Sequence, residues 1–513
     1  MTERTPMTVT SRRLRLGEVL VVGLLGSALI SWWAWTDAAP GHPADPAGME
    51  IGPWLAGLLG LVLLLAAWLR SAVLRSHRLL SAAVWSVPLL PTRPVLSLDG
   101  WAYAAQGWLL RHGHNPYLVA QSQAGQLAAR VDDHWSGTTA VYPPGSLWIQ
   151  AAMTALARDH TYWAAVAMRI PAVLAMVLLA AAVIGLARAL GADPQSALWL
   201  TVANPFVLLN IVGGMHNDGL ELAVALCALW AGLALARASR PWLGLVVGGV
   251  LVGLAGTLKQ PGVLAGIGLV ALVHRQAVKD GGRDGWGPLG ARILVGAVPA
   301  VAVFAAISSI GGLGLGWLNS TAGSPASVTS DSPIALLVQM IGWAGVPIAA
   351  MVPIATAVSL VLTAVAIVWC WFRWGPVPGR RGGAGPLGRP IVLQAAVMTA
   401  FALCGAGLQP WYLIPPLVLV ALIPLRRRWL AALAAAGLIG SGLCFLQWFS
   451  SPFLALPVAA LAAAACRWWT PVRSRLDLVA HQLRGPAPGA ARSGTSGTAT
   501  GAAGAAGPSV TGM

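Results

Sequence analysis

The chain begins with MTERTPMTVTSRRLRLG (residues 1–17) and continues directly with EVLVVGLLGSALISWWAWT (residues 18–36), and these two segments decide the fold class. A basic segment before an apolar run of about 18 residues has the layout of a signal peptide. The TDAAPGHP that follows is a poor cleavage site, so we interpret the run as a retained helix. A run of this length is long enough to cross a bilayer.

Similar apolar runs recur along most of the 513 residues. Hydrophobic residues make up 57% of the chain, charged residues make up 9%, and the mean hydropathy is +0.72. Soluble domains carry about a quarter charged residues, so an ordinary soluble protein is excluded. We predict an all-α polytopic membrane domain over residues 18–475, with about 14 transmembrane helices and a range of about 13–16.

The two ends of the chain lie outside this predicted membrane domain. Residues 1–17 are predicted to be a basic cytoplasmic N-terminus, because arginines gather on the cytoplasmic side of the first span. Residues 476–513 are predicted to be a disordered cytoplasmic tail, since the chain ends in a low-complexity stretch of small residues.

The net charge of +16 would indicate nucleic acid as a partner if the chain were soluble. Here the basic residues cluster between apolar runs, which is typical of cytoplasmic loops that face anionic lipid headgroups. We therefore expect membrane lipid among the partners and no nucleic acid.

The charge pattern also predicts the orientation of the chain. The N-terminal arginines place the first segment inside, so the second helix (about 53–74) returns and the third (about 79–92) leads outward again. This order delivers residues 93–142 to the extracytoplasmic face as one large polar loop. Four later segments are predicted on the same face, namely GGMHNDG (213–219), LKQPG (258–262), the stretch 316–333 and LQPWY (408–412). The alternation requires that two short apolar segments, about 145–158 and 334–350, do not cross.

Asp99 is the first candidate for chemistry, because ionisable groups are costly at membrane level and few acids lie in the outer loops. A carboxylate there can act as a general base toward a hydroxyl. The structural alternative is an N-cap on a short amphipathic helix over 101–111 that lies along the membrane.

Two further polar groups occur in the predicted outer loops. His216, Asn217 and Asp218 stand where one span ends and the next begins, so Asp218 is either a functional carboxylate or a helix cap. Lys259, one of two lysines in the chain, is suited to a phosphate, or else it is a snorkelling lysine. Arg111, His112, His114 and Arg169 are weaker candidates, and Trp101, Trp108, Trp135 and Trp411 are positioned to stack on sugar rings.

The chain contains no phosphate-binding loop, dinucleotide fingerprint or metalloprotease motif. Its five cysteines lie in or next to apolar runs without a CxxC pair, so they do not form a disulfide or metal framework. We predict no metal and no cofactor.

Five motifs in order resemble one family. They are LDGWAYAAQGWLLRHGHNPY (98–117), VYPPGSLW (141–148), ALWLTVANPFVLLNIVGGMHNDGLELAVAL (197–226), TLKQPGVL (257–264) and LQPWYLIPPL (408–417). Together they resemble the actinobacterial polyprenol-phosphate-mannose-dependent α-(1→6)-mannosyltransferases of the GT-C superfamily, over about residues 80–430. That resemblance implies a multispan glycosyltransferase with a catalytic first outer loop, placed in the plasma membrane with an extracytoplasmic active site.

The resemblance also implies roles for individual residues. Asp99 is implied as the catalytic base, although family members usually read Asp-Val-Tyr-Ser-Tyr where this chain has Asp-Gly-Trp-Ala-Tyr. The implied substrate-binding residues are Tyr103, Arg111, Asn115, Tyr142, His216, Asn217, Asp218, Lys259, Gln409, Trp411 and Tyr412.

The implied reaction moves mannose from polyprenyl-phosphate-mannose to a growing α-(1→6)-mannan glycolipid acceptor of the cell envelope, with inversion at the anomeric carbon. In this scheme Lys259 stabilises the leaving phosphate, together with His216 or an arginine. Two alternatives stay open on the sequence. The first is a GT-C transferase that uses another lipid-linked sugar, and the second is a non-catalytic lipid or sugar transporter.

Overall fold

The structure is a computed structural model that describes residues 9–36, 51–319, 330, 332–378, 387–405, 407–447, 452–468 and 470–484. These residues form helices and contain no strand. The helices are α1 (Val9–Thr36), α2 (Ile51–Ser71), α3 (Arg78–Ser86), α4 (Asp99–Arg111), α5 (Asp133–Ser136), α6 (Pro144–Leu156), α7 (Thr161–Ala167), α8 (Arg169–Leu190), α9 (Pro194–Leu200), α10 (Pro205–Leu208), α11 (Asp218–Arg237), α12 (Pro241–Leu258), α13 (Ala265–Lys279), α14 (Trp286–Ser309), α15 (Pro333–Trp343), α16 (Ile348–Trp374), α17 (Gly388–Cys404), α18 (Ile414–Ala421), α19 (Arg427–Gln447), α20 (Pro452–Trp468) and α21 (Thr470–Arg484).

Nine helical segments in the described part of the chain are long and apolar enough to cross a membrane. A tenth is possible if α9 and the α10 region, bent by 56°, form one broken span. The chain is thus a polytopic all-α membrane protein, as predicted, but the expected number of about 14 helices is not confirmed. Prolines divide several apolar runs into shorter pieces, because proline removes a helical hydrogen bond. The predicted third crossing, for example, is only α3 and the short 3₁₀ helix Val87–Leu89.

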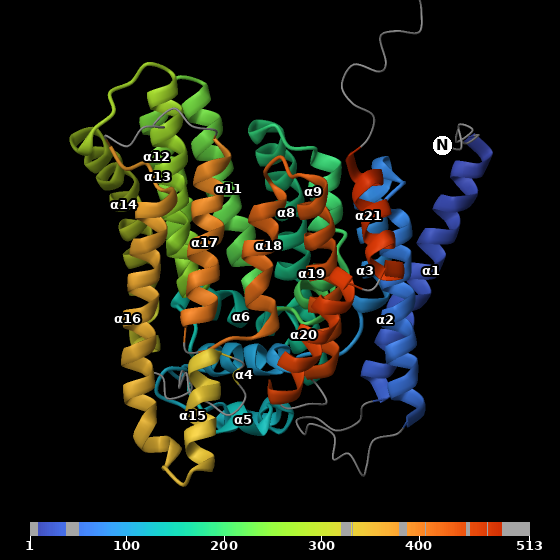
Figure 1. Cartoon of the computed structure of the whole chain (residues 1–513). Helices are drawn as coiled ribbons and strands as arrows, with labels where there is room; N and C mark the ends of the chain where they lie inside the picture. Colours follow the sequence, from blue (N-terminus) through green and yellow to red (C-terminus); the bar gives the residue numbers. More distant parts are fainter. Residues whose placement is uncertain are drawn as a thin grey trace, which may run out of the picture.

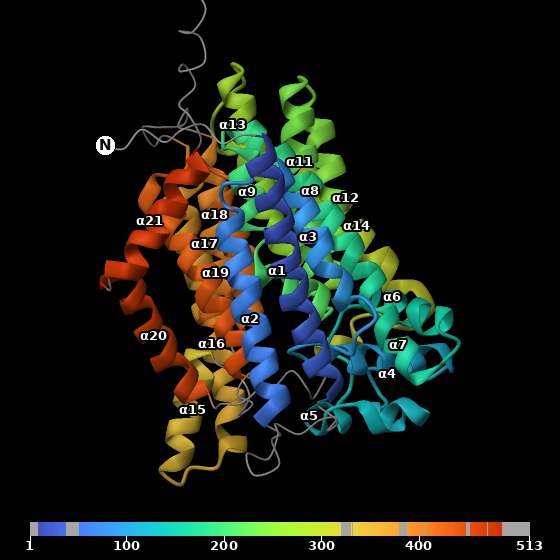
Figure 2. The same cartoon turned by 90° about the vertical axis from the view of Figure 1, so that its right-hand side faces the viewer.

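The segment 93–142 folds at one end of the bundle, beside α6 and α7 (Figures 1 and 2). Its main element, α4, is enclosed rather than amphipathic, since most of its residues from Gly100 to Leu109 are buried. Gly107 allows α6 to approach closely, because a Cβ there would lie 2.4 Å from the carbonyl oxygen of Gln150. The predicted surface helix over 101–111 therefore exists, but it lies inside the protein.

The two apolar segments that were predicted not to cross are short helices. They are α6, with 13 residues, and α15, with 11 residues, and each is too short to span a bilayer. This keeps the polar loops on one end of the bundle, opposite the end at which α1 begins (Figure 1).

Small residues let the spans pack closely. Gly26 of α1 and Gly60 of α2 face each other so tightly that an added Cβ on either would lie within 2.7 Å of the other's carbonyl oxygen. Deeper in the bundle, Trp68 and Trp199 stack with ring centroids 4.2 Å apart, and each indole donates to the other residue's carbonyl. Close backbone contact of this kind is how membrane helices associate in the absence of a hydrophobic driving force.

The predicted tail from residue 476 begins as ordered structure. Residues up to Arg484 belong to α21, whose apolar face packs on α19 and α20. The disorder expected over 476–484 is therefore wrong, because the low-complexity composition starts only after that helix. The remaining part, 485–513, and the N-terminal residues 1–8 lie outside the described residues.

Candidate active site

Asp99 is the first residue of α4, and its side chain faces other polar groups rather than the helix end. Leu98 is the N-cap, and the cap makes no side-chain hydrogen bond. Oδ2 of Asp99 instead accepts a hydrogen bond from the Tyr103 hydroxyl at 3.1 Å and another from Nδ1 of His216 at 3.2 Å. The cap alternative is thus wrong, and 18% of the carboxyl side chain stays exposed to an incoming group.

His216 is held in place from several sides. The preceding Met215 has a φ of 58°, a left-handed conformation that turns the chain sharply before α11. The imidazole ring stacks on Trp411 with centroids 3.8 Å apart and planes 19° apart. Because Asp99 can only accept, Nδ1 carries the proton, and the buried Nε2 has no protein partner.

Lys259 and Asp218 form a buried ion pair. The ammonium of Lys259 donates to both carboxylate oxygens of Asp218 at 2.7 Å, and it lies 4.3 Å from the ring centroid of Tyr412. Only 8% of the lysine side chain and 11% of the aspartate side chain are exposed. Asp218 is therefore not a cap, since Asn217 holds that position, and Lys259 does not snorkel.

Two tyrosines extend the hydrogen bonds that end at Asp99. The hydroxyls of Tyr103 and Tyr142 are 3.3 Å apart. Since Tyr103 donates to Asp99, Tyr142 is the donor in this second bond. The Tyr142 backbone is fixed in turn, because the Tyr117 hydroxyl donates to its carbonyl at 2.7 Å. Asn217, next to His216, donates a hydrogen bond to Oγ of Ser146 in α6 at 2.6 Å.

The electrostatics favour an ionised Asp99. Burial by itself raises the pKa of a carboxyl group, but the hydrogen bond from His216, the charge of Lys259 and the Tyr103 hydroxyl outweigh it, so the pKa of Asp99 is lowered. Burial raises the pKa of Tyr103, and the Asp99 charge adds to this. Burial alone would lower the pKa of Lys259, but Asp218 raises it far above the usual value. These shifts favour a carboxylate at Asp99 and an ammonium at Lys259 at neutral pH.

Three predicted residues have other surroundings. Arg111 ends α4, about 18 Å along the helix from Asp99, and it pairs with Asp159 at the surface. Asn115 accepts from the backbone N–H of Tyr117 at 3.0 Å and orders a turn. Gln409 directly precedes the 3₁₀ helix Pro410–Leu413, which carries Trp411 and Tyr412. The structure thus leaves Arg111 and Asn115 outside the cluster and places Gln409 only through its backbone, next to Trp411 and Tyr412. The other predicted residues, Tyr103, Tyr142, His216, Asn217, Asp218, Lys259, Trp411 and Tyr412, lie together with Asp99.

Two of the weaker candidates, His112 and His114, and three of the tryptophans are also placed by the structure. His112 and His114 stack on Trp108, the guanidinium of Arg130 lies 5.9 Å from the ring centroid of Trp101, and Trp135 belongs to α5.

Among the described residues, no three His, Cys, Asp or Glu side chains are grouped so that they could hold a metal ion.

Arg169 connects the two loops that carry Asp99 and His216. Its guanidinium donates to the carbonyls of Thr92 and Arg93 before α4, and to those of Val212 and Gly213 before the His216 loop. Val95 adds a backbone bond to Gly213 at 3.0 Å. The sequence indicated Arg169 only as one of the weaker polar candidates, and its four carbonyl contacts could not be predicted from the sequence.

The substitution Arg169→Gln is expected to lower the free energy of unfolding by more than about 3 kcal/mol, because it leaves several buried carbonyls without donors. Thermal unfolding of the purified protein measures this. Arg158→Gln, at an exposed neighbouring arginine, is the matched control and is expected to change little. Equal stability of the two variants would show that Arg169 does not hold the loops.

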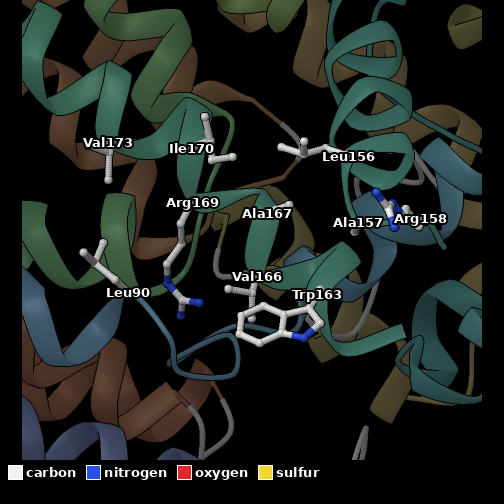
Figure 3. Close-up of a pocket in the computed structure, with 10 residues that line it drawn as sticks. All are labelled: Leu90, Leu156, Ala157, Arg158, Trp163, Val166, Ala167, Arg169, Ile170 and Val173. Atoms are coloured by element: carbon white, nitrogen blue, oxygen red, sulfur yellow. The ribbon is translucent and has the colours of Figure 1, made fainter. Parts of the chain in front are cut away.

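A groove lies beside Arg169, at the junction of α6, α7 and α8 (Figure 3). It has a volume of about 650 Å³ and is lined mainly by apolar side chains, among them Leu90, Leu156, Trp163 and Ile170. We call it the α6–α8 groove. Arg158 lies at its rim, and both Arg158 and Asp159 have positive φ values, 50° and 60°, which non-glycine residues seldom adopt.

Sequence reasoning missed one acid near the cluster. Glu221 lies one turn after Asp218 in α11 and is 2% exposed. Its spacing of three residues from Asp218 places both on neighbouring positions of one helix face, and this spacing is the signal that could have found it.

These features define a class. A bundle of membrane helices gathers a carboxylate, an imidazole, an ion pair and two aromatic rings at one end, next to an apolar groove. This is the arrangement of a multi-pass membrane protein with a polar, partly exposed site at one end of its helix bundle.

Comparison with known proteins gives the family. The model for the α-(1→6)-mannopyranosyltransferase N-terminal domain matches residues 17–275, and the chain belongs to this family, which is one of glycosyltransferases. That range includes every residue of the cluster except Trp411 and Tyr412.

Three relatives are similar over part of the chain. α-(1→6)-Mannopyranosyltransferase A of Mycobacterium tuberculosis is 30% identical over 378 residues, which are 69% of this chain and 66% of the relative. The enzyme of the same name from Corynebacterium glutamicum is 33% identical over 144 residues, 28% of this chain and 29% of the relative. A further M. tuberculosis α-(1→6)-mannopyranosyltransferase is 28% identical over 390 residues, 67% and 64% of the two chains. The matches thus span less than two thirds of the relatives' own lengths. No solved structure matches the chain.

Proposed function

We propose that the chain is an inverting mannosyltransferase that moves mannose from polyprenyl-phosphate-mannose to a growing α-(1→6)-mannan of a cell-envelope lipoglycan. The observation that carries the proposal is the Asp99 carboxylate, ionised, partly exposed and held by Tyr103 and His216. Membership of a mannosyltransferase family supports mannose as the sugar.

The proposed reaction is a single displacement at the anomeric carbon. Asp99 takes the proton of the acceptor 6-hydroxyl, and the oxygen of that hydroxyl forms a bond to the anomeric carbon of the donor. The bond from this carbon to the phosphate oxygen breaks, so a β-linked mannose becomes α-linked and the lipid phosphate leaves with the electron pair. The phosphate is itself a good leaving group, and we therefore propose no cofactor for this step.

Two groups are suited to the leaving phosphate. An ammonium has three N–H donors, and Lys259 uses two of them on Asp218, so one remains for a phosphate oxygen. Nε2 of His216 is buried without a protein partner and is the second group. Preorganised donors of this kind stabilise charge that develops in the transition state. The Asp218 contact reduces the free charge of Lys259, so its contribution is smaller than that of an unpaired lysine.

The α6–α8 groove is proposed to hold the first isoprene units of the donor. Its walls are apolar, and its volume of about 650 Å³ falls in the usual range of ligand sites. Arg169 lines the groove and donates to the loops before Asp99 and His216, which supports a lipid chain in the groove that ends near the carboxylate. We further propose that this end of the bundle faces the outside of the plasma membrane, since the arginine clusters lie at the other end.

The test supplies polyprenyl-phosphate-mannose and a short α-mannoside acceptor to membranes that contain the wild-type chain. We expect a product longer by one mannose that an α-(1→6)-specific mannosidase removes. Polyprenyl-phosphate-glucose and polyprenyl-phosphate-arabinose are the matched donors. Transfer from one of these with none from the mannose donor would contradict the proposed sugar, and transfer from none of them would contradict the proposed enzyme.

The pH dependence of the transfer should follow the lowered pKa of Asp99. The base is active when ionised, so the rate should stay level across neutral pH and fall only below the ordinary carboxyl pKa of about 4. The same ionised form contributes stability that is complete above about pH 4 and is lost as the pH falls through the folded pKa. In His216→Phe, which keeps a ring on Trp411 but removes the hydrogen bond, the acid limb of the rate profile should move to higher pH. His112→Asn, at an exposed histidine, serves as the control. If the acid limb of the rate profile did not move in His216→Phe, the result would argue against the effect of the His216–Asp99 hydrogen bond on the pKa of Asp99.

A further inference from the structure

A second buried polar cluster lies at the opposite end of the bundle from Asp99. It consists of His274, Arg275 and Gln276 on α13 and Arg292 on α14, whose exposed fractions are 2%, 3%, 5% and 6%. α13 begins near Lys259, and Arg275 lies ten residues after Ala265, about 15 Å further along the helix. Nothing in the proposed reaction uses these residues.

The acids near this cluster already have partners. Arg292 donates to Nδ1 of His274 at 2.8 Å, so Nδ1 is an acceptor and the proton is on Nε2, which donates to Asp284 at 3.2 Å. His274 therefore links the charges of Arg292 and Asp284. The side-chain amide of Gln276 donates to both oxygens of Asp280, at 2.9 and 2.8 Å.

Arg275 lacks such a partner. Its Nε and Nη1 are buried and have no hydrogen-bond acceptor among the residues that the structure describes. The charged groups that act on it are Arg389, which repels it, and Asp284, which is occupied by His274. A buried guanidinium with unsatisfied N–H groups is unfavourable, so Arg275 favours an acceptor beyond those that the described residues supply.

The face of α13 that carries Arg275 packs against α17. Gly268 and Ala271 stand seven and four residues before Arg275 and so share its helix face. Both contact α17, since the N–H of Gly268 donates to Oε1 of Gln394 at 2.9 Å and Ala271 packs against Leu393. α13 and α17 run side by side in opposite directions (Figure 1). From the hydrogen bond between Gly268 and Gln394, seven residues toward the C-terminus of α13 lead to Arg275. Seven residues in the same direction in space, toward the N-terminus of α17, lead to its N-cap at residue 387.

The first turn of α17 is itself positive. It contains no acid, and among the described residues its N-cap makes no side-chain hydrogen bond. The backbone N–H groups of Gly388 and Arg389 and the helix dipole are therefore uncompensated there, whereas Pro390 has no N–H. Arg389 adds a cation and uses Nη2 to donate to the Arg373 carbonyl at 3.0 Å. The buried Arg275 on α13 and the N-terminus of α17 therefore lie at the same level of two neighbouring helices.

We propose that Arg275, Arg389 and the N-terminus of α17 form a binding site for a phosphate group, carried by an anionic lipid headgroup or by free phosphate. Guanidinium groups bind phosphate oxygens through paired, charge-assisted hydrogen bonds, and helix N-termini bind anions through their N–H groups. Basic pockets between membrane helices recognise lipid headgroups by the same contacts. The site is separate from the Asp99 cluster and holds its ligand at the other side of the membrane.

The test uses the purified full chain in phosphatidylcholine nanodiscs. One arm adds a minor fraction of phosphatidylglycerol, a second adds inorganic phosphate at matched ionic strength, and a third adds chloride only. We expect phosphatidylglycerol, inorganic phosphate or both to raise the unfolding midpoint by about 2 °C or more, because a ligand that binds only the folded state stabilises it. A shift with phosphatidylglycerol alone identifies the lipid, and an equal shift with phosphate identifies the free anion. No shift in either arm overturns the proposal.

Variants locate the site. Arg275→Gln and Arg389→Gln should each weaken binding at least about tenfold, in line with the loss of a charge-assisted hydrogen bond. Arg283→Gln, at an exposed arginine of the same end, should bind as the wild type does. If Arg275→Gln does not fold, Arg389→Gln decides the result. Wild-type affinity in Arg389→Gln and in any folded Arg275→Gln would place the anion elsewhere and overturn the proposal.

Discussion

Membranes that contain Asp99→Asn are expected to transfer mannose more slowly than wild-type membranes by about 10²- to 10⁴-fold, the contribution of a positioned general base. Asparagine has the size of aspartate, and its amide oxygen has two lone pairs, so it can still accept the hydrogen bonds of both Tyr103 and His216. What it loses is the ability to take a proton. The measurement is the initial rate with polyprenyl-phosphate-mannose and a short α-mannoside acceptor.

Two companion variants separate chemistry from folding. Asp159→Asn removes a carboxylate that pairs with Arg111 at the surface, and its rate should stay near that of the wild type. Asp99→Glu keeps the carboxylate but moves it by one methylene, so a partial rate is expected. A full rate in a folded Asp99→Asn protein would remove Asp99 from the role of base.

The second large effect is expected at the Lys259–Asp218 pair. Lys259→Met and Asp218→Leu should each lower the free energy of unfolding by about 3–5 kcal/mol, because each leaves one buried charge without its partner. The double variant should lose less than either single one, since no charge then remains buried. Thermal or denaturant unfolding of the four proteins gives the coupling between the two residues.

A surface pair provides the comparison for this cycle. Glu18 and Arg70 form an ion pair whose side chains are 49% and 63% exposed. Glu18→Gln should change stability by no more than about 1 kcal/mol, because exposed pairs are screened by water and salt. A double variant as unstable as the sum of its two single variants would show that the Lys259–Asp218 contact is not what stabilises this region.

The sequence predicted the common location of the site residues for a physical reason. Arginine clusters mark one end of the bundle, so polar loops without basic residues should gather at the other end. Asp99, His216, Lys259 and Trp411 are indeed in one cluster. The pattern depends only on the alternation of the spans, and it does not require the exact number of crossings.

The partner of each side chain was not predictable in the same way. Lys259 and Asp218 are 41 residues apart, and their bidentate contact depends on how α11 packs against α12. Arg111 was grouped with the site because its motif is near Asp99 in sequence, but the length of α4 carries it away. The count of about 14 transmembrane helices is not confirmed, because hydropathy alone does not show where a proline divides a run.

The cluster is assembled from segments more than 300 residues apart, and this has a consequence for biosynthesis. Its carboxylates, its imidazole and its ammonium are all made by residue 259, whereas the ring that stacks on His216 and the ring beneath Lys259 arrive only with residues 411 and 412. A nascent chain that enters the bilayer from its N-terminus thus carries an incomplete site through most of its synthesis. Transfer activity would then report that the last third of the chain has been inserted correctly.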